Sequence, residues 1–154
     1  MLDNGDRLGS SAAAPSEIVW TRCLCVHVQR AGRAIARRYD RAFRPLKITS
    51  WQFTLLVALD RGTPLSVGGL ARELSMDRTT VPANVRPLQR RGLVRIRRDE
   101  HDRRSHRVEL TEAGSRVLAK AYRIWEVTHS MEVQHFRDFD LGAFRAGLRT
   151  VFSH

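Results

Sequence analysis

The chain has 154 residues and a formal net charge of +11, with 42% apolar and 28% charged residues. This length fits one domain, and the ordinary composition excludes a wholly disordered chain. The longest mainly apolar stretch, residues 53–59, is too short for a membrane-spanning helix, and the first residues lack the pattern of a secretory signal. Cys23 and Cys25 cannot form a disulfide framework, and their spacing on a helix disfavours a bridge. We therefore expect a reduced, cytoplasmic protein.

The first part of the chain predicts a short arm followed by two helices. Residues 1–15 are rich in Gly, Ser and Ala and are expected to be disordered. Apolar residues at helical spacing then predict a helix over 16–44, which ends before Pro45. Thr49 and Gln52 form a capping-box pattern, which predicts a second helix to about residue 59.

Two shorter helices are expected next. Ser66 is the expected N-cap of a third helix that runs to about Ser75, although two glycines weaken its first turn. Asp77 is the expected N-cap of a fourth helix. That helix ends at Gly92, because glycine suits the left-handed conformation after a helix.

The second half predicts a hairpin followed by two more helices. Residues 93–97 and 106–110 alternate in polarity as strands do, and a charged tip at 99–105 separates them. Thr111 is the expected N-cap of a long helix to about residue 135, and Asp140 that of a last helix through residue 152.

This order predicts a mostly α protein with a winged helix-turn-helix. We expect that unit at about residues 49–110, with its wing at 94–110, inside a single domain over 16–154. The helices at 16–44 and 112–152 carry more apolar surface than a small winged unit can cover, and long helices need a packed apolar face to be stable. We therefore predict that they form a symmetric homodimer.

The positive charge is concentrated in one segment. Residues 78–107 contain ten arginines and three acidic residues, which gives +7 of the net charge, and the whole chain has only two lysines. Arginine offers a planar fork of donors that suits phosphate and guanine. The pattern favours a nucleic-acid interface over the alternative of a solvated basic face.

Three tracts resemble the MarR-type transcriptional regulators. They are Leu70-Ala-Arg-Glu-Leu-Ser-Met-Asp-Arg-Thr-Thr-Val81, Leu88-Gln-Arg-Arg-Gly-Leu-Val94, and the stretch from Asp99 to Gly114 with its Val-Glu-Leu-Thr-Glu-Ala-Gly end. The helix order extends the resemblance over residues 16–152. It implies a homodimer that binds palindromic double-stranded DNA, usually as a repressor, and that releases DNA when a small molecule or an oxidant arrives.

The fourth helix is the expected recognition helix. Its apolar positions would face the core, so the opposite face would reach the major groove. The candidate contacts are Arg78, Thr79, Thr80, Pro82, Ala83 and Arg86. Arg78 suits a bidentate contact to guanine and Arg86 a phosphate, while the alternative for the threonines is ordinary helix-start chemistry.

The prolines of this helix are a departure from the family pattern. Relatives often carry a Thr-Arg-like pair where this chain has Pro82 and Ala83, at positions that commonly reach bases. Because Pro82 and Pro87 each remove a helical hydrogen bond, we expect the helix to bend or to begin later. No operator preference is carried over from a relative.

The wing supplies a second group of candidates. Asp102 and Arg104 match the family's pair in which the aspartate orients an arginine that enters the minor groove, where arginine is favoured when the groove is narrow. Arg103 and Arg107 are expected to contact phosphates. The arginines at 95, 97 and 98 are either further contacts or solvated charges of the hairpin.

Cys25 is the candidate for redox sensing. Leu24-Cys25 with Tyr39 is similar to the organic-hydroperoxide-sensing branch of the family, in which tyrosines stabilise a reactive thiolate, although Gln29 stands where one such tyrosine is expected. The alternative is that Cys25 only packs as a small apolar residue, as most buried cysteines do. Cys23 and His27 have metal-ligand spacing, but two ligands do not make a zinc site, so we expect no metal and no cofactor.

The resemblance also implies an effector pocket for a small aromatic or carboxylate compound. Its candidate lining residues are His27, Arg30, Trp51 and Phe53, and the alternative is that they pack in the core or the dimer interface. A function of another class, a basic RNA-binding or architectural protein, is compatible with the arginine-rich hairpin. We do not expect the protein to be an enzyme, because the sequence lacks a phosphate-binding loop, a nucleophile elbow and paired catalytic carboxylates.

Overall fold

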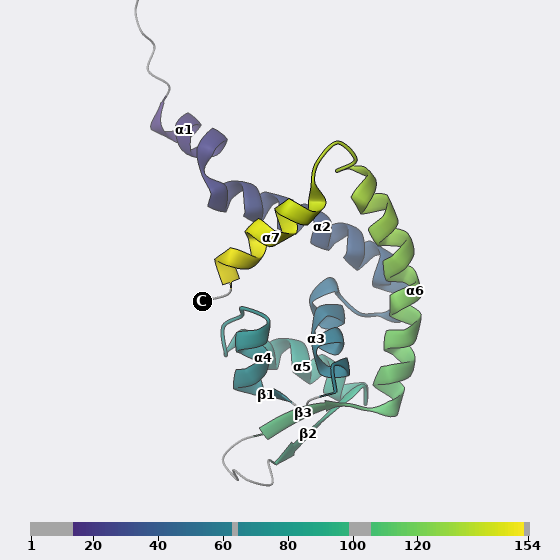
Figure 1. The fold of residues 1–154 in the computed structure, drawn as a ribbon. Helices are drawn as coiled ribbons and strands as arrows, with labels where there is room; N and C mark the ends of the chain where they lie inside the picture. The colour runs from purple at the N-terminus through teal and green to yellow at the C-terminus, as the bar shows by residue number, and fades with distance from the viewer. Residues whose placement is uncertain (1–13, 63–64, 99–105, 153–154) are drawn as a thin grey trace, which may run out of the picture. The chain divides into compact units, whose positions relative to one another are not determined.

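The computed structural model describes residues 14–62, 65–98 and 106–152, most of which lie in helices, with one small sheet in the second half of the chain (Figure 1). Its contacts divide the chain into two units, residues 1–34 and 35–154, and each is described by itself. Within the described ranges, no helix combines the length and the apolar character needed to cross a bilayer.

The first unit contains α1 (Pro15–Arg22) and the beginning of α2 (Leu24–Phe43). The expectation of one continuous helix from residue 16 to 44 was wrong, because Cys23 has extended backbone angles, φ −72° and ψ 113°. None of the residues of α1 is buried, so no apolar core holds the two segments in line. The Nε2 atom of His27 lies 2.9 Å from the Thr21 carbonyl oxygen, which gives a free carbonyl at the end of α1 a partner.

The second unit begins with the rest of α2, followed by the 3₁₀ turn η1 (Arg44–Leu46) and α3 (Ser50–Asp60). The predicted capping box is confirmed: Thr49 Oγ1 accepts from Gln52 N, and Gln52 Oε1 accepts from Thr49 N. Asp40 Oδ1 also accepts from Ser50 N at 2.6 Å, which fixes the start of α3 against α2.

The helix-turn-helix consists of α4 (Val67–Glu73) and α5 (Thr80–Arg90). The predicted cap of α4 is confirmed, since Ser66 Oγ accepts from Gly69 N at 2.9 Å. The predicted cap of α5 at Asp77 was wrong: the helix begins at Thr80, after a turn in which Thr80 N donates to the Asp77 carbonyl. The later start places Pro82 in the first turn, where a missing N–H breaks no helical hydrogen bond. Pro87 remains inside the helix.

The wing belongs to an antiparallel sheet of three strands in the order β1-β3-β2. The strands β2 (Val94–Arg98) and β3 (His106–Leu110) form the predicted hairpin. The very short β1 (Leu65–Ser66) was not predicted, and it pairs with β3 on the other side. The tip of the wing, 99–105, lies outside the described residues.

Two further helices follow, α6 (Glu112–Gln134) and α7 (Leu141–Phe152). Both predicted caps are confirmed: Thr111 Oγ1 accepts from Gly114 N at 3.0 Å, and Asp140 Oδ1 accepts from Ala143 N at 2.9 Å. Contacts join α3 to α6, and α3, α4 and α5 to one another and to the strands (Figure 1). This packing fixes α5 by its apolar side and leaves its other side for the candidate interface.

An ion pair joins α2 to α6 within the second unit. Arg38 and Glu132 form a bidentate ion pair. Arg38 Nη2 donates to Glu132 Oε2 at 2.6 Å, and Arg38 Nε donates to the other carboxylate oxygen. The Glu132 side chain is nearly buried, so this pair satisfies a carboxylate that would otherwise be desolvated without a partner.

Candidate nucleic-acid interface

The predicted recognition helix, α5, is held by three apolar side chains that lie on one face at helical spacing. Val81, Val85 and Leu88 are fully or almost fully buried and belong to the main core cluster. Because these residues fix the orientation of α5, its opposite face is open to solvent. The exposed predicted contacts are Arg78, Thr79, Thr80, Ala83 and Arg86, while Pro82 is half-buried.

Arg78 precedes α5 and lies against the helix before it. A Cβ atom built on Gly68, in the first turn of α4, would be 3.1 Å from Arg78 Nη2 and 3.4 Å from its Cζ. The guanidinium group therefore packs over the bare backbone of Gly68. A side chain at position 68 would crowd it, so Gly68 helps to set where Arg78 points.

The described part of the wing presents arginines on one face of the hairpin. Arg107 lies opposite Arg97 in the strand register, and Arg95 lies opposite Glu109. Arg95 Nε donates to Glu109 Oε2 at 2.7 Å, and Arg97 Nε lies 3.8 Å from the same oxygen. The predicted contacts Asp102, Arg103 and Arg104 lie outside the described residues.

Sequence reasoning missed Glu109 as a partner of the wing arginines. The signal was available, because a hairpin register that pairs Val94 with Leu110 also places Glu109 opposite Arg95. Opposite charges on directly opposed residues stabilise a strand pair. The two alternatives for these arginines, DNA contact and solvated charge, therefore need a third: a paired charge within the wing.

Arg91 was also missed, and it links the end of α5 to the segment after α2. Its guanidinium donates to the Leu46 carbonyl at 2.9 Å and to the Lys47 carbonyl. Lys47 has a left-handed backbone, φ 53°. No pattern in the local sequence identifies this contact, because 44 residues separate Arg91 from Lys47.

The predicted effector residues fall into the two units. In the first unit, His27 contacts the Thr21 carbonyl, and the Arg30 guanidinium lies over the Trp20 ring at 4.1 Å. In the second unit, Trp51 is exposed, whereas Phe53 packs against Phe43 and Tyr122 with ring centroids 4.7 and 6.0 Å away. Phe53 thus has a place in the packing of its own unit.

The candidate redox residues are likewise in different units. In the first, Cys25 is exposed, and Gln29 Nε2 donates to its sulfur at 3.1 Å. In the second, Tyr39 is half-buried and packs against Phe43, with ring centroids 5.9 Å apart. Burial raises the pKa of Tyr39, and the charge of Glu132 adds to the effect. Among the residues that the structure describes, no three His, Cys, Asp or Glu side chains are grouped to hold a metal ion.

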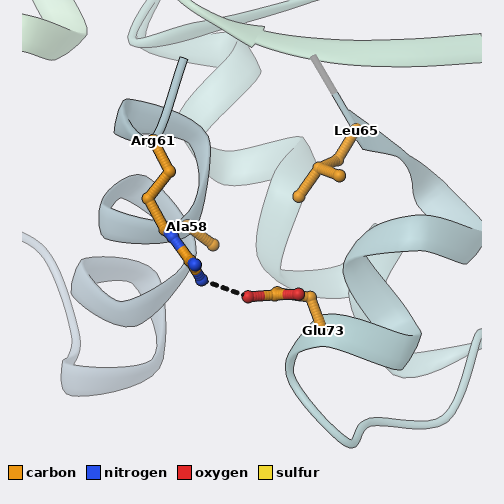
Figure 2. Close-up of a pocket in the computed structure, with 4 residues that line it drawn as sticks. All are labelled: Ala58, Arg61, Leu65 and Glu73. Atoms are coloured by element: carbon orange, nitrogen blue, oxygen red, sulfur yellow. Dashed lines mark hydrogen bonds and ion pairs between the residues drawn. The ribbon is translucent and has the colours of Figure 1, made fainter. Parts of the chain in front are cut away.

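A pocket of about 290 Å³ lies between α3, β1 and α4. It is lined by Ala58, Arg61, Leu65 and Glu73 (Figure 2). Its two charged side chains form an ion pair with each other. Since each charge already has a partner, the pocket offers little to recognise a charged ligand.

Comparisons with known proteins agree with this geometry. Residues 46–105 match the family model described as the MarR family. The structure resembles that of the M. tuberculosis transcriptional regulator MosR in complex with DNA, with a TM-score of 0.77 and 30% identity over 85% of this chain and 94% of that one. One curated relative is the transcriptional activatory protein BadR of Rhodopseudomonas palustris, with 28% identity over 90% of this chain and 77% of the relative. Another is the organic hydroperoxide resistance transcriptional regulator of Bacillus subtilis, with 29% identity over 64% of this chain and 67% of the relative. The chain belongs to the MarR family of DNA-binding transcriptional regulators.

Proposed function

We propose that the protein is a sequence-specific repressor that binds palindromic double-stranded DNA as a homodimer and is released by a small-molecule effector. The observation that carries the proposal is the orientation of α5. Its apolar side is buried in the core, and its opposite side exposes Thr79, Ala83 and Arg86. In a helix-turn-helix, residues near the start of such a helix contact base edges in the major groove.

The proposed dimer is supported by apolar side chains that remain exposed in each unit. Monomeric proteins rarely expose large contiguous apolar patches, so many such residues on the terminal helices support a protein partner. In the first unit they are Ile18, Val19, Trp20, Leu24 and Val28, and on or beside α6 and α7 they are Val127, Met131, Phe139, Phe144, Val151 and Phe152. We propose that the helices within 16–44 and 112–152 form the dimer. Sedimentation at micromolar concentration should give twice the chain mass, and a monomer that binds a full palindrome would contradict the proposal.

Sequence-specific binding is tested by selecting a duplex from a random library and measuring its affinity against salt. A two-fold dimer should select two half-sites centred about 10–11 base pairs apart. If about 6–10 phosphates are neutralised, log K should fall against log salt with a slope of about −5 to −9. A selected RNA of matched length that competes equally would favour the RNA-binding or architectural alternative.

Single arginine variants separate phosphate contacts from base contacts. Arg86→Gln should weaken all duplexes alike and reduce the salt slope by about one unit, whereas Arg78→Gln should relax the base preference at one symmetric pair of positions. In the wing, Arg104→Ala should weaken the selected duplex by about 1–3 kcal/mol per half-site. Arg123→Gln, which removes an exposed charge from α6, is the matched control and should change little.

The effector is proposed to be a small aromatic or carboxylate compound. Two of the candidate residues, His27 and Arg30, lie in the first unit, and Arg30 supplies a cation that suits a carboxylate. Arg30 rests on Trp20, so a ligand would have to compete with that contact or share it. Titration of a panel of aromatic carboxylates should find compounds that dissociate the selected duplex, and Arg30→Gln should weaken their effect without weakening DNA binding.

Thiol-based sensing of organic peroxide is a second candidate, because Cys25 is exposed and accepts a hydrogen bond from Gln29. A peroxide would oxidise the thiol to a sulfenic acid and be reduced to the alcohol. Cumene hydroperoxide should then release DNA from the wild-type protein and from Cys23→Ser but not from Cys25→Ser. Equal release in both cysteine variants, or none in the wild type, would reject this candidate.

A further inference from the structure

The two faces of the β2–β3 hairpin differ in chemistry. Val94, Ile96, Val108 and Leu110 alternate toward the core, where Val94 and Val108 are fully or almost fully buried. Side chains of a strand alternate between faces, so the outer face carries the residues between them. These are Arg95 and Arg97 on β2, and Arg107 and Glu109 on β3.

Glu109 is the only acidic side chain among these four, and it lies between two of the arginines. Its Oε2 atom accepts from Arg95 Nε at 2.7 Å and lies 3.8 Å from Arg97 Nε. The Glu109 side chain is 23% exposed, whereas those of Arg95 and Arg97 are 52% and 60% exposed. The carboxylate therefore lies low on the sheet, and the two guanidinium groups extend past it toward solvent.

This arrangement affects how the wing meets a polyanion. Arg97 and Arg107 are directly opposed in the register, and opposed like charges destabilise a strand pair. Glu109 offsets that repulsion and gives Arg95 a partner before any nucleic acid arrives. When a phosphate binds Arg95, the arginine must leave or share its carboxylate, which reduces the net gain from the phosphate contact.

We propose that Glu109 is a specificity-determining residue, which holds Arg95 and thereby limits sequence-independent binding of phosphates by the wing. This inference rests on the DNA-binding function proposed above. Sequence-independent affinity arises almost entirely from phosphate neutralisation, whereas a selected duplex adds base contacts made by other residues. Loss of the carboxylate should therefore strengthen binding to any duplex and narrow the ratio between selected and random sequences.

The test is Glu109→Gln in the full chain, measured on the selected duplex and on a random-sequence duplex of the same length. We expect the affinity for the random duplex to rise about three- to tenfold at low salt. The salt slope should become steeper by about one unit for each wing that docks. The selected duplex should gain less, so the ratio of the two affinities should fall. A rise by the same factor on both duplexes would overturn the proposal.

Two further variants separate this effect from a general gain of charge. Asp138→Asn is the matched control, because it also removes a carboxylate paired with an arginine, here Arg137 at 3.5 Å, and both side chains are exposed in the segment between α6 and α7. It should leave the ratio unchanged. In the double variant Arg95→Gln/Glu109→Gln, the gain of Glu109→Gln should disappear, and its persistence would overturn the proposal.

The outcome is distinguishable from failure of the proposed function. If the wild-type protein selects no duplex, the sequence-specific function itself fails. If the wild type selects a duplex with the expected salt slope and Glu109→Gln behaves as the wild type does, only the role of Glu109 is refuted. Glutamine has nearly the shape of glutamate, and a surface ion pair contributes only about 0–1 kcal/mol to stability, so thermal unfolding should confirm that the variant folds.

Discussion

Replacement of Gly114 by alanine should strongly destabilise the winged unit. Gly114 lies in the first turn of α6, where a Cβ atom would be 2.0 Å from the Leu93 carbonyl oxygen and 2.8 Å from Leu110 Cδ1. An aliphatic carbon and a carbonyl oxygen rarely approach closer than about 3.3 Å. The start of α6 and Leu93, the residue before β2, must therefore separate by roughly 1 Å to admit one methyl group.

The free energy of this separation can be built from its parts. Overpacking a closely packed site costs about 1–3 kcal/mol. The shift also strains the bonds that Thr111 makes across the same gap, from its N to the Leu93 carbonyl at 3.1 Å and from its Oγ1 to the Gly92 carbonyl at 2.6 Å. Each contributes about 0.5–1.5 kcal/mol. Alanine returns up to about 1 kcal/mol through its higher helix propensity, so the expected net loss is about 3 kcal/mol.

Urea unfolding followed by circular dichroism measures this loss. Gly32→Ala in α2 and Gly147→Ala in α7 are matched controls, because a Cβ atom at either position meets no atom of the described residues within 4 Å. Both controls should leave the free energy of unfolding unchanged or raise it by up to about 1 kcal/mol. If Gly114→Ala unfolds within about 0.5 kcal/mol of the wild type, the close approach of α6 to Leu93 is wrong.

Three other changes probe different parts of the molecule. Thr49→Ala removes the hydroxyl that accepts from Gln52 N in the capping box and should lower the free energy of unfolding by about 1 kcal/mol in the same urea assay. Burial and the hydrogen bond to Asp60 raise the pKa of Tyr122. Because the tyrosine of the unfolded chain ionises at a lower pH, the free energy of unfolding should fall as the pH rises above about 10. Denaturation of Tyr122→Phe at the same pH values should show a smaller fall. Gly68→Ala should keep or raise the melting temperature. Selection from a random library should show an altered base preference, because the new methyl group displaces Arg78. An unchanged base preference would argue against a contact between Arg78 and bases.

The parts of the fold that depend on neighbouring residues were predictable from the sequence. The caps at Thr49, Ser66, Thr111 and Asp140 were identified because a side-chain oxygen three residues before a free backbone N–H is a local arrangement. The hairpin followed from alternation of polarity, and the buried side of α5 from helical spacing. These features place the candidate interface without knowledge of any distant contact.

The features that the sequence did not predict depend on competition between signals or on distant packing. Asp77 is a good cap by composition, but Pro82 is tolerated best in a first turn, and this preference moved the start of α5 to Thr80. The break at Cys23 involves neither glycine nor proline, so no local breaker announced it. The two-residue strand β1 is too short for a periodic pattern and exists because β3 offers it a paired edge.

The hydrogen bonds from Arg91 to the Leu46 and Lys47 carbonyls have a consequence for how an effector could act. Arg91 directly follows α5, the proposed recognition helix, and connects its end to the segment between α2 and α3. If that segment is displaced, either the end of α5 follows it or two charge-assisted hydrogen bonds must break. An effector that moves α2 would therefore not need to contact the winged unit in order to change the orientation of α5. The strength of the two Arg91 hydrogen bonds would limit the coupling free energy between effector binding and operator binding.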